Sequence, residues 1–155
     1  MKNVSLTDHF QFRFLFFIFH FSFFMKLPSS QERAQVAAKI ATDNRGQNVV
    51  ILDLRDVTSN FDFFVIVTGS SRRQLHAISE EIDKVYEKEL GDRRLSLSGY
   101  EESRWIVLDY GDIIVHLFDE ETREYYALEE LWAKAKILPF PPEKTTMISE
   151  SAGKE

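Results

Sequence analysis

The sequence predicts an α/β (α+β) domain in which helices cover a mixed β-sheet. Two apolar runs rich in β-branched residues, at 48–54 and 63–68, are typical of strands buried inside a sheet. Two further strand-like runs, 105–109 and 113–118, are joined through a tight turn that contains glycine. Segments with apolar residues at helical spacing lie before, between and after these runs. The expected order of elements is therefore α-β-β-α-β-β-β-α.

The first helix is expected to begin after Ser29, because Ser29 and Glu32 have the spacing of a capping box. An apolar helix face follows, and it consists of Val36, Ala37, Ile40 and Ala41. The segment 44–46 ends this helix, since its Asn and Gly tolerate the left-handed conformation. The strands at 48–54 and 63–68 come next.

The second helix begins after the Gly-Ser-Ser turn at 69–71 and ends at Gly91. Its apolar residues at helical spacing are Leu75, Ile78, Ile82, Val85 and Leu90. The alternating segment 95–99 indicates a half-buried strand. A last helix is expected over 121–136 and is terminated by Pro139. Its predicted apolar side consists of Tyr125, Leu128, Leu131, Trp132 and Ala135.

The composition indicates a single domain that is not a free-standing nucleic-acid-binding protein. The chain has 155 residues, the size of one domain, and we place that domain at 29–138. Its net charge is −6, whereas phosphate neutralisation requires clustered Lys and Arg. Cysteine is absent, which excludes disulfide bonds and thiolate metal sites and suits a reducing cytoplasm.

The two ends differ from this domain. Nine of the fourteen Phe lie within 10–24, a run that polar residues interrupt and that is shorter than a membrane span. No cleavage site typical of a secretory signal follows it. Because Met25 precedes the domain, we interpret 1–24 as an over-called start or a non-structural extension, with a membrane or organelle anchor as the alternative. The proline-marked, polar segment 139–155 is predicted to be a disordered tail.

The stretch 105–132 combines aromatic side chains with strong negative charge. It carries one Arg, Arg123, against eight carboxylates, which are Asp109, Asp112, Asp119, Glu120, Glu121, Glu124, Glu129 and Glu130. A negative field beside aromatic side chains fits docking onto a basic partner better than it fits bond-making chemistry.

This stretch resembles the ribosomal silencing factor family, also called Iojap-like proteins. The pattern W-x-x-x-D-x-G-D-x-x-V-H, then R-x-x-Y-x-L-E-x-L-W, is carried by Trp105, Asp109, Gly111, Asp112, Val115, His116, Arg123, Tyr126, Leu128, Glu129, Leu131 and Trp132. The resemblance extends upstream through 61–82 and covers about 32–136 in all. One departure is Ser98 before Gly99, where members usually have Glu, so a contact made by that Glu is in doubt.

The resemblance implies a nucleotidyltransferase-like fold and a translational repressor in the cytoplasm. Such a repressor binds the large ribosomal subunit through a basic ribosomal protein at the intersubunit face and sterically blocks subunit joining. Organelle relatives are tied to large-subunit assembly instead. A contact of Arg72 and Arg73 with ribosomal RNA, and a homodimer formed through the hairpin face, are further interpretations.

The sequence supports an enzyme less well than it supports a docking protein. The turn at 69–71 lacks the lysine of a P-loop and the repeated glycines of a dinucleotide loop, so an ordinary capped turn is the simpler reading. Nucleotidyltransferases also need paired carboxylates for Mg²⁺, and the strand at 95–98 has none. We therefore expect no catalytic residues, cofactor, metal or small-molecule substrate. A nucleotidyltransferase-like enzyme remains the alternative.

The predicted partner-binding residues are Trp105, Asp109, Tyr110, Gly111, Asp112, His116, Tyr125 and Tyr126. Each has a structural alternative. Asp109 and Asp112 could instead stabilise the turn, or form a pair of carboxylates for metal binding or acid/base chemistry. His116 could be an ordinary residue of the sheet interior, or it could shape the docking face by hydrogen-bonding a neighbouring carboxylate. The aromatic residues suit a core, but Tyr125 and Tyr126 are adjacent on one helix, so at least one must be exposed.

Overall fold

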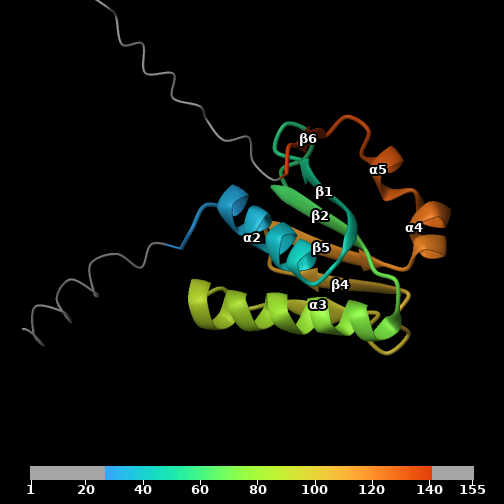
Figure 1. Ribbon diagram of the computed structural model, residues 1–155. Helices are drawn as coiled ribbons and strands as arrows, with labels where there is room; N and C mark the ends of the chain where they lie inside the picture. The colour runs from blue at the N-terminus through green and yellow to red at the C-terminus, as the bar shows by residue number, and fades with distance from the viewer. Residues whose placement is uncertain (1–26, 141–155) are drawn as a thin grey trace, which may run out of the picture.

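The computed structural model describes residues 27–140 (Figure 1). The extension predicted at 1–24 and the segment 141–155 of the predicted tail lie outside the described residues. The elements, in chain order, are α2 Ser30–Asp43, β1 Gln47–Asp53, β2 Phe63–Thr68, α3 Arg72–Val85, the π-helical turn η1 Tyr86–Leu90, β3 Ser96–Ser98, β4 Trp105–Asp109, β5 Ile113–Phe118, α4 Glu120–Tyr126, α5 Leu128–Leu131 and β6 Lys136–Leu138. None of the helices described between residues 27 and 140 has the length and apolar content that a membrane span requires.

Six strands form one mixed sheet in the order β3-β4-β5-β2-β1-β6. The central strands β2 and β5 run parallel, from the pair Phe63 and Ile113 to the pair Thr68 and Phe118. The other neighbouring strands are antiparallel. Every residue of β2 and β5 is buried, as expected for central strands covered on both faces. The predicted fold class, a mixed sheet flanked by helices, is confirmed.

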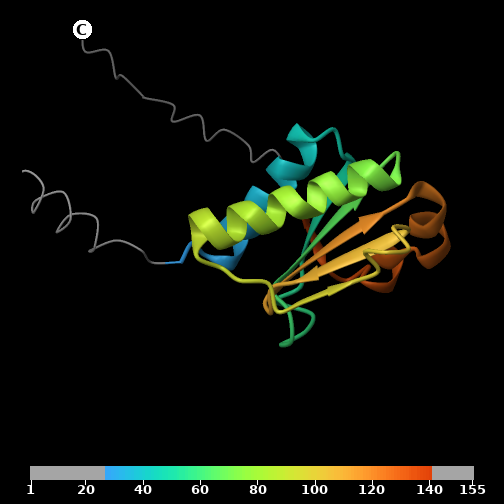
Figure 2. The ribbon, with the colours of Figure 1, turned by 90° about the horizontal axis from the view of Figure 1, so that it is seen from below.

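The two faces of the sheet are covered unequally. The long helices α2 and α3 cover one face, while the short helices α4 and α5 lie on the opposite side (Figures 1 and 2). The alanines of α2 are fully buried and let this helix approach the sheet closely; they are Ala34, Ala37, Ala38 and Ala41. On the opposite face, Trp105 and Val107 of β4 are only half-buried. This incompletely covered face contains the candidate site.

The predicted starts of the first two helices and the predicted end of the second are confirmed. The first helix ends within the predicted segment 44–46, but the residue in the left-handed conformation there is Arg45, at φ 62°, and not the Asn or Gly. The Ser29 side chain accepts a hydrogen bond from the backbone N–H of Glu32, and the Glu32 carboxylate accepts one from the backbone N–H of Ser29. At α3, the Ser71 side chain caps the backbone N–H of Gln74. The helical path continues through η1 and ends at Gly91, which adopts the left-handed conformation at φ 69°.

The single helix predicted over 121–136 is wrong. After α4, Ala127 adopts a left-handed conformation with φ 43° and ψ 52°, and α5 is a separate short helix. The chain then forms β6, which pairs antiparallel with β1. The cause is tertiary: Arg123 donates hydrogen bonds to the backbone oxygen of Asn48 at 2.7 Å and to the carboxylate of Glu129 at 2.9 Å. These contacts join α4 and α5 to β1 and override the helix propensity of alanine.

Side chains near the C-terminal end also differ from the prediction. Leu128 is buried, whereas Tyr125 and Leu131 of the predicted apolar side are 81% and 74% exposed. Phe140 is half-buried and packs against the core beneath α2 and α3, although the predicted tail begins at 139. The packed domain therefore extends at least through Phe140.

Candidate docking site

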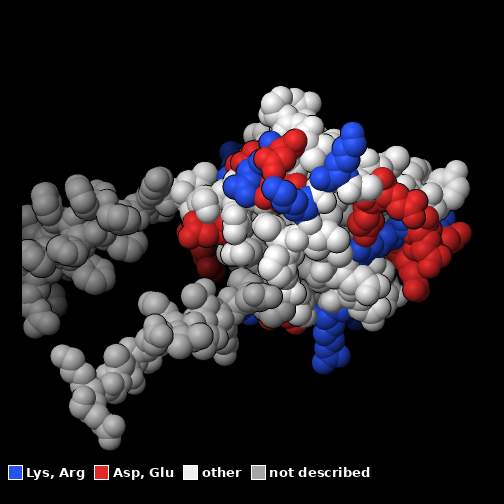
Figure 3. All heavy atoms as spheres, turned by 90° about the horizontal axis from the view of Figure 1, so that it is seen from above, with Lys and Arg blue, Asp and Glu red and all other residues white. Residues whose placement is uncertain are grey.

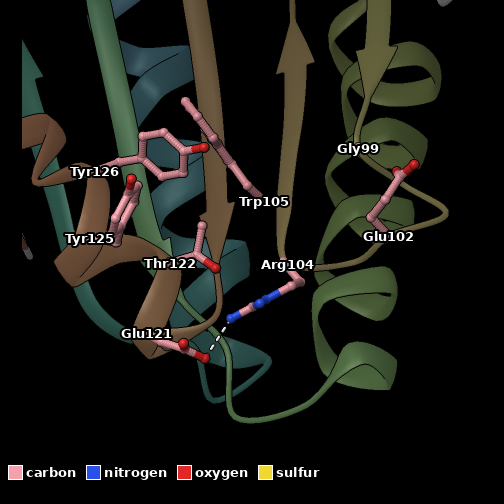
Figure 4. A pocket seen from close by; sticks show the side chains of 8 residues that line it. All are labelled: Gly99, Glu102, Arg104, Trp105, Glu121, Thr122, Tyr125 and Tyr126. Atoms are coloured by element: carbon pink, nitrogen blue, oxygen red, sulfur yellow. Dashed lines mark hydrogen bonds and ion pairs between the residues drawn. The ribbon is translucent and has the colours of Figure 1, made fainter.

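A surface pocket of about 520 Å³ lies where the start of β4 meets α4 (Figure 4). Its lining residues are Gly99, Glu102, Arg104, Trp105, Glu121, Thr122, Tyr125 and Tyr126. Figure 4 shows Trp105 and Tyr126 beside each other, with Arg104 directed toward Glu121. The pocket therefore combines an aromatic wall with charged groups at its rim.

Hydrogen bonds and ion pairs hold α4 against the loop that precedes β4. The Asp119 backbone N–H donates to the Arg104 carbonyl at 2.9 Å, and the Arg104 guanidinium donates to the carboxylates of Asp119 at 2.9 Å and Glu121 at 2.5 Å. Asp119 also caps α4 by accepting from the Thr122 N–H at 2.7 Å. Burial raises the pKa of Asp119, but hydrogen bonds from Thr122 and Arg104 outweigh it and hold the pKa below its ordinary value. Asp119 is therefore ionised at neutral pH.

The aromatic wall contains side chains from β4, β5 and α4. Trp105 stacks on Phe118 with ring centroids 4.8 Å apart, and Tyr126 contacts the indole at the same centroid distance. Tyr125 meets Tyr126 edge-on at 5.1 Å and is the most exposed large apolar side chain in 27–140. Tyr125 and Tyr126 are both exposed, which satisfies the prediction that at least one must be. Exposed aromatic side chains held by packing are typical anchors of protein interfaces.

Gly99 allows the β4 backbone to reach this position. Its φ is +71°, and a Cβ added there would lie 1.9 Å from the carbonyl oxygen of Trp105. Any other residue would push the Trp105 backbone away, so the loop that bounds the pocket requires glycine.

His116 lies beneath the aromatic wall on β5, and it is buried. Its Nδ1 accepts a hydrogen bond of 3.2 Å from the Trp105 indole N–H, and its ring meets Phe64 edge-on at 4.7 Å. Desolvation lowers the pKa of His116 to about 3, so the imidazole is neutral at physiological pH. The prediction that His116 lies inside the sheet with Ile114 and Phe118 is confirmed. The prediction that it bonds a carboxylate is wrong, because its partner is the indole.

The burial of His116 has a consequence for stability. The unfolded imidazole takes up a proton below about pH 6.5, while the folded one stays neutral down to about pH 3. The free energy of unfolding should therefore fall as pH drops through this window, by at most about 1.4 kcal/mol per pH unit from this group. Urea unfolding at pH 7, 6 and 5 should show a smaller loss for His116→Phe than for the wild type. Equal losses in both would contradict this assignment.

The hairpin turn lies at the other end of β4 and β5. Trp105 pairs with Phe118, while Asp109 pairs with Ile114, so the turn is about 13 Å from Trp105 at about 3.3 Å per residue. The prediction placed the turn and the aromatic residues on one docking face. The structure shows two separate groups: Trp105, His116, Tyr125 and Tyr126 at one end, and Asp109, Tyr110, Gly111 and Asp112 at the other.

Each side chain at the turn has a structural contact. The Asp109 carboxylate accepts a hydrogen bond of 2.8 Å from the Gly111 backbone N–H, which supports the interpretation that Asp109 stabilises the turn. Tyr110 is only 5% exposed and donates to Asp83 at 3.0 Å; burial raises its pKa above the ordinary value. Asp112 pairs with Arg33 of α2. Tyr110, one of the predicted partner-binding residues, is therefore not available as an exposed anchor.

Only part of the acidic charge of 105–132 is free. Asp112, Asp119, Glu121 and Glu129 are paired with arginines, and Asp109 binds the turn. Glu120, Glu124 and Glu130 are exposed and have no ion pair within 27–140. They line a second pocket of about 440 Å³ around Arg123, and Figure 3 shows acidic side chains gathered on the side where α4 lies. These free carboxylates supply the negative field next to the aromatic wall.

Five residues that line the pocket were not among the predicted partner-binding residues: Gly99, Glu102, Arg104, Glu121 and Thr122. A signal for Arg104 was present, because extending the register Trp105–Phe118 by one residue places Arg104 opposite Asp119. Opposite charges across paired strands favour each other, so the pair was open to prediction once the register was known.

The turn at 69–71 has the geometry of an ordinary capped helix start. The Ser70 N–H donates to the Gln74 side-chain oxygen at 2.6 Å, so a side chain of the same helix occupies this amide. The Arg72 guanidinium donates to the Glu101 carbonyl at 2.6 Å. In the part of the chain that the structure describes, no three His, Cys, Asp or Glu side chains are grouped to hold a metal ion.

Comparisons with known proteins agree with the motif. Residues 27–155 match the family described as "Ribosomal silencing factor during starvation". A ribosomal silencing factor of Halalkalibacterium halodurans is 39% identical over 107 residues, which are 69% of this chain and 91% of that protein. A mouse protein named "Mitochondrial assembly of ribosomal large subunit protein 1" is 40% identical over 73 residues, 46% of this chain and 32% of its own length.

The fold agrees as well. The crystal structure of a protein from Chromobacterium violaceum superposes with a TM-score of 0.65 at 32% sequence identity, and the match covers 68% of this chain and 88% of that one. The family match spans far more than half of the chain, and the similarity includes the strands and helices that build the pocket. The chain belongs to the ribosomal silencing factor family.

Proposed function

We propose that this protein represses translation by docking its Trp105 pocket onto a basic protein of the large ribosomal subunit and sterically blocking subunit joining. The observation that carries the proposal is the aromatic wall of Trp105, Tyr125 and Tyr126 beside free carboxylates, in a chain that belongs to the silencing factor family. Interfaces take their affinity from buried aromatic anchors, and charge complementarity speeds their formation. The effect is occupancy of a surface in the cytoplasm, with no bond made or broken.

The first test is co-sedimentation of the full-length chain with purified large subunits, with small subunits as the control. The proposal expects a saturable complex with large subunits alone, weakened by added salt because charge attraction contributes to it. Equal recovery with both subunits, or none with large subunits at low salt, would refute the proposal.

Assembly of the large subunit is the second candidate function, because a mouse relative is named for that process in mitochondria. The two roles differ in when the protein acts. A repressor binds mature subunits and lowers translation without changing their number. An assembly factor binds precursor particles, so that depleting it lowers the amount of mature large subunits. Gradient profiles of depleted cells would separate the two roles.

An enzymatic role as a nucleotidyltransferase is tested by calorimetry. In the structure the strand β3 presents Ser96, Leu97 and Ser98, so it offers no carboxylate for Mg²⁺. Titration of the chain with nucleoside triphosphate and Mg²⁺ should therefore give no binding heat. Saturable binding of nucleotide would support the enzymatic alternative.

The free carboxylates should control the rate of association. Reversing Glu124 and Glu130 to Lys should slow binding to large subunits by about tenfold at low salt, because oppositely charged surfaces steer encounter. The matched control reverses Glu87 and Glu89, which are exposed on η1, and changes net charge equally. Stopped-flow fluorescence would measure both association rates. Equal slowing in the two variants would show a general charge effect and contradict a steering role for α4 and α5.

A further inference from the structure

The polar contact of the Trp105 indole points into the protein. The indole nitrogen can only donate a hydrogen bond, and its N–H donates to Nδ1 of His116 at 3.2 Å. The two rings come from neighbouring strands, β4 and β5, and lie with centroids 5.9 Å apart. The indole therefore presents the remainder of its ring, and no donor, toward the pocket.

This contact also fixes the state of the imidazole. A neutral imidazole accepts at one nitrogen and carries its proton on the other, so acceptance at Nδ1 places the proton on Nε2. Nε2 is buried and has no hydrogen-bond partner among residues 27–140. Around it the ring packs against the aromatic side chains of Phe64, Trp105 and Phe118.

An unsatisfied buried polar atom lowers stability, so His116 is a poor choice for packing alone. A phenylalanine would suit these aromatic neighbours and remove the unpartnered Nε2, but it would leave the Trp105 N–H without its acceptor. What histidine adds at this position is an acceptor directed at the Trp105 N–H. The unpartnered Nε2 therefore lowers the stability of the fold, whereas Nδ1 fixes the orientation of the indole.

We propose that His116 is a positioning residue that holds the Trp105 indole in the orientation needed for docking. This inference rests on the proposed function of the Trp105 pocket. A preorganised side chain binds more tightly than a mobile one because less conformational freedom is lost on association. His116 thus contributes to affinity through Trp105 without touching the partner itself.

The test uses His116→Phe and His116→Gln in the full-length chain, with two readouts. The first is affinity for purified large subunits. The second is the indole N–H resonance of Trp105 in nitrogen–proton NMR spectra, which is readily assigned because the chain has only two Trp. His116→Phe should fold stably, yet bind about tenfold more weakly and shift the Trp105 indole resonance. His116→Gln should restore part of both, because its amide oxygen can accept the N–H.

A double-variant cycle separates positioning from a structural effect. Trp105→Phe removes the donor, so adding His116→Phe to it should cause no further loss of affinity. Wild-type affinity for His116→Phe, an unchanged indole resonance, or an equal loss in both backgrounds would overturn the inference. A wild-type chain that fails to bind large subunits would instead overturn the proposed function, and the indole resonance alone would then decide whether His116 orients Trp105.

Discussion

Replacing Trp105 with Ala is expected to lower affinity for the large ribosomal subunit by about 30-fold or more, the effect of losing about 2 kcal/mol at an interface hot spot. The indole stacks on Phe118, contacts Tyr126 and forms a wall of the pocket. Its removal takes away the largest aromatic surface at the site and the packing that supports Tyr126. Equilibrium binding of labelled chain to purified large subunits measures the change.

The matched control is Leu95→Ala. Leu95 is 71% exposed and donates its backbone N–H to the Asp109 carbonyl, at the hairpin end of the sheet. Truncating it removes exposed apolar surface far from the pocket and should leave affinity within about twofold, since most surface positions contribute little. If both truncations weaken binding equally, or if neither does, docking does not depend on the pocket.

Replacing Arg33 with Leu is expected to lower the free energy of unfolding by about 3 kcal/mol or more, because it leaves carboxylates without their buried partner. Arg33 is 4% exposed and pairs with Asp92 and with Asp112. The Tyr86 hydroxyl also donates a hydrogen bond of 2.5 Å to the backbone carbonyl of Arg33. These contacts join α2, the loop after η1 and the hairpin turn. Urea unfolding at pH 7 measures the loss.

Lys39→Ala is the control for this stability prediction. Lys39 lies on the same helix and pairs with Asp43, but both side chains are exposed, at 69% and 59%. An exposed pair of this kind contributes about 0–1 kcal/mol. A loss for Arg33→Leu no larger than that for Lys39→Ala would show that the buried pairs do not stabilise the hairpin end. Subunit binding by any folded Arg33 variant should persist, because the pocket lies at the other end of the sheet.

The first five strands and the first two helices were predictable because their signals are local, whereas β6, which forms by pairing with β1, was not predicted. The apolar runs 48–54 and 63–68 are long enough to indicate buried strands, and Ser29 and Gly91 carry their own capping chemistry. The break at Ala127 has no such signal. Alanine favours helices, and its left-handed conformation follows from contacts of Arg123 with β1 and α5 that are remote in sequence.

The site was predictable in composition and less so in geometry. The aromatic and acidic character of 105–132 is visible in the sequence. Adjacent positions on one helix require at least one of Tyr125 and Tyr126 to be exposed, but helical spacing placed Tyr125 on the apolar side, and both are exposed. The separation of the Tyr110 turn from Trp105 requires the strand register, and the burial of Tyr110 requires its contact with Asp83. Residues near in sequence on a hairpin can lie at its opposite ends, which is why a contiguous motif became two groups.

The most direct test of the proposed repression is subunit joining, followed by light scattering, with the chain titrated onto large subunits before small subunits are added. Under steric repression, the joined fraction falls as the chain occupies large subunits, with the same midpoint as binding. The Trp105→Ala variant should reach that effect only at about 30-fold higher concentration. A chain that saturates the large subunits while joining proceeds unchanged would contradict steric repression.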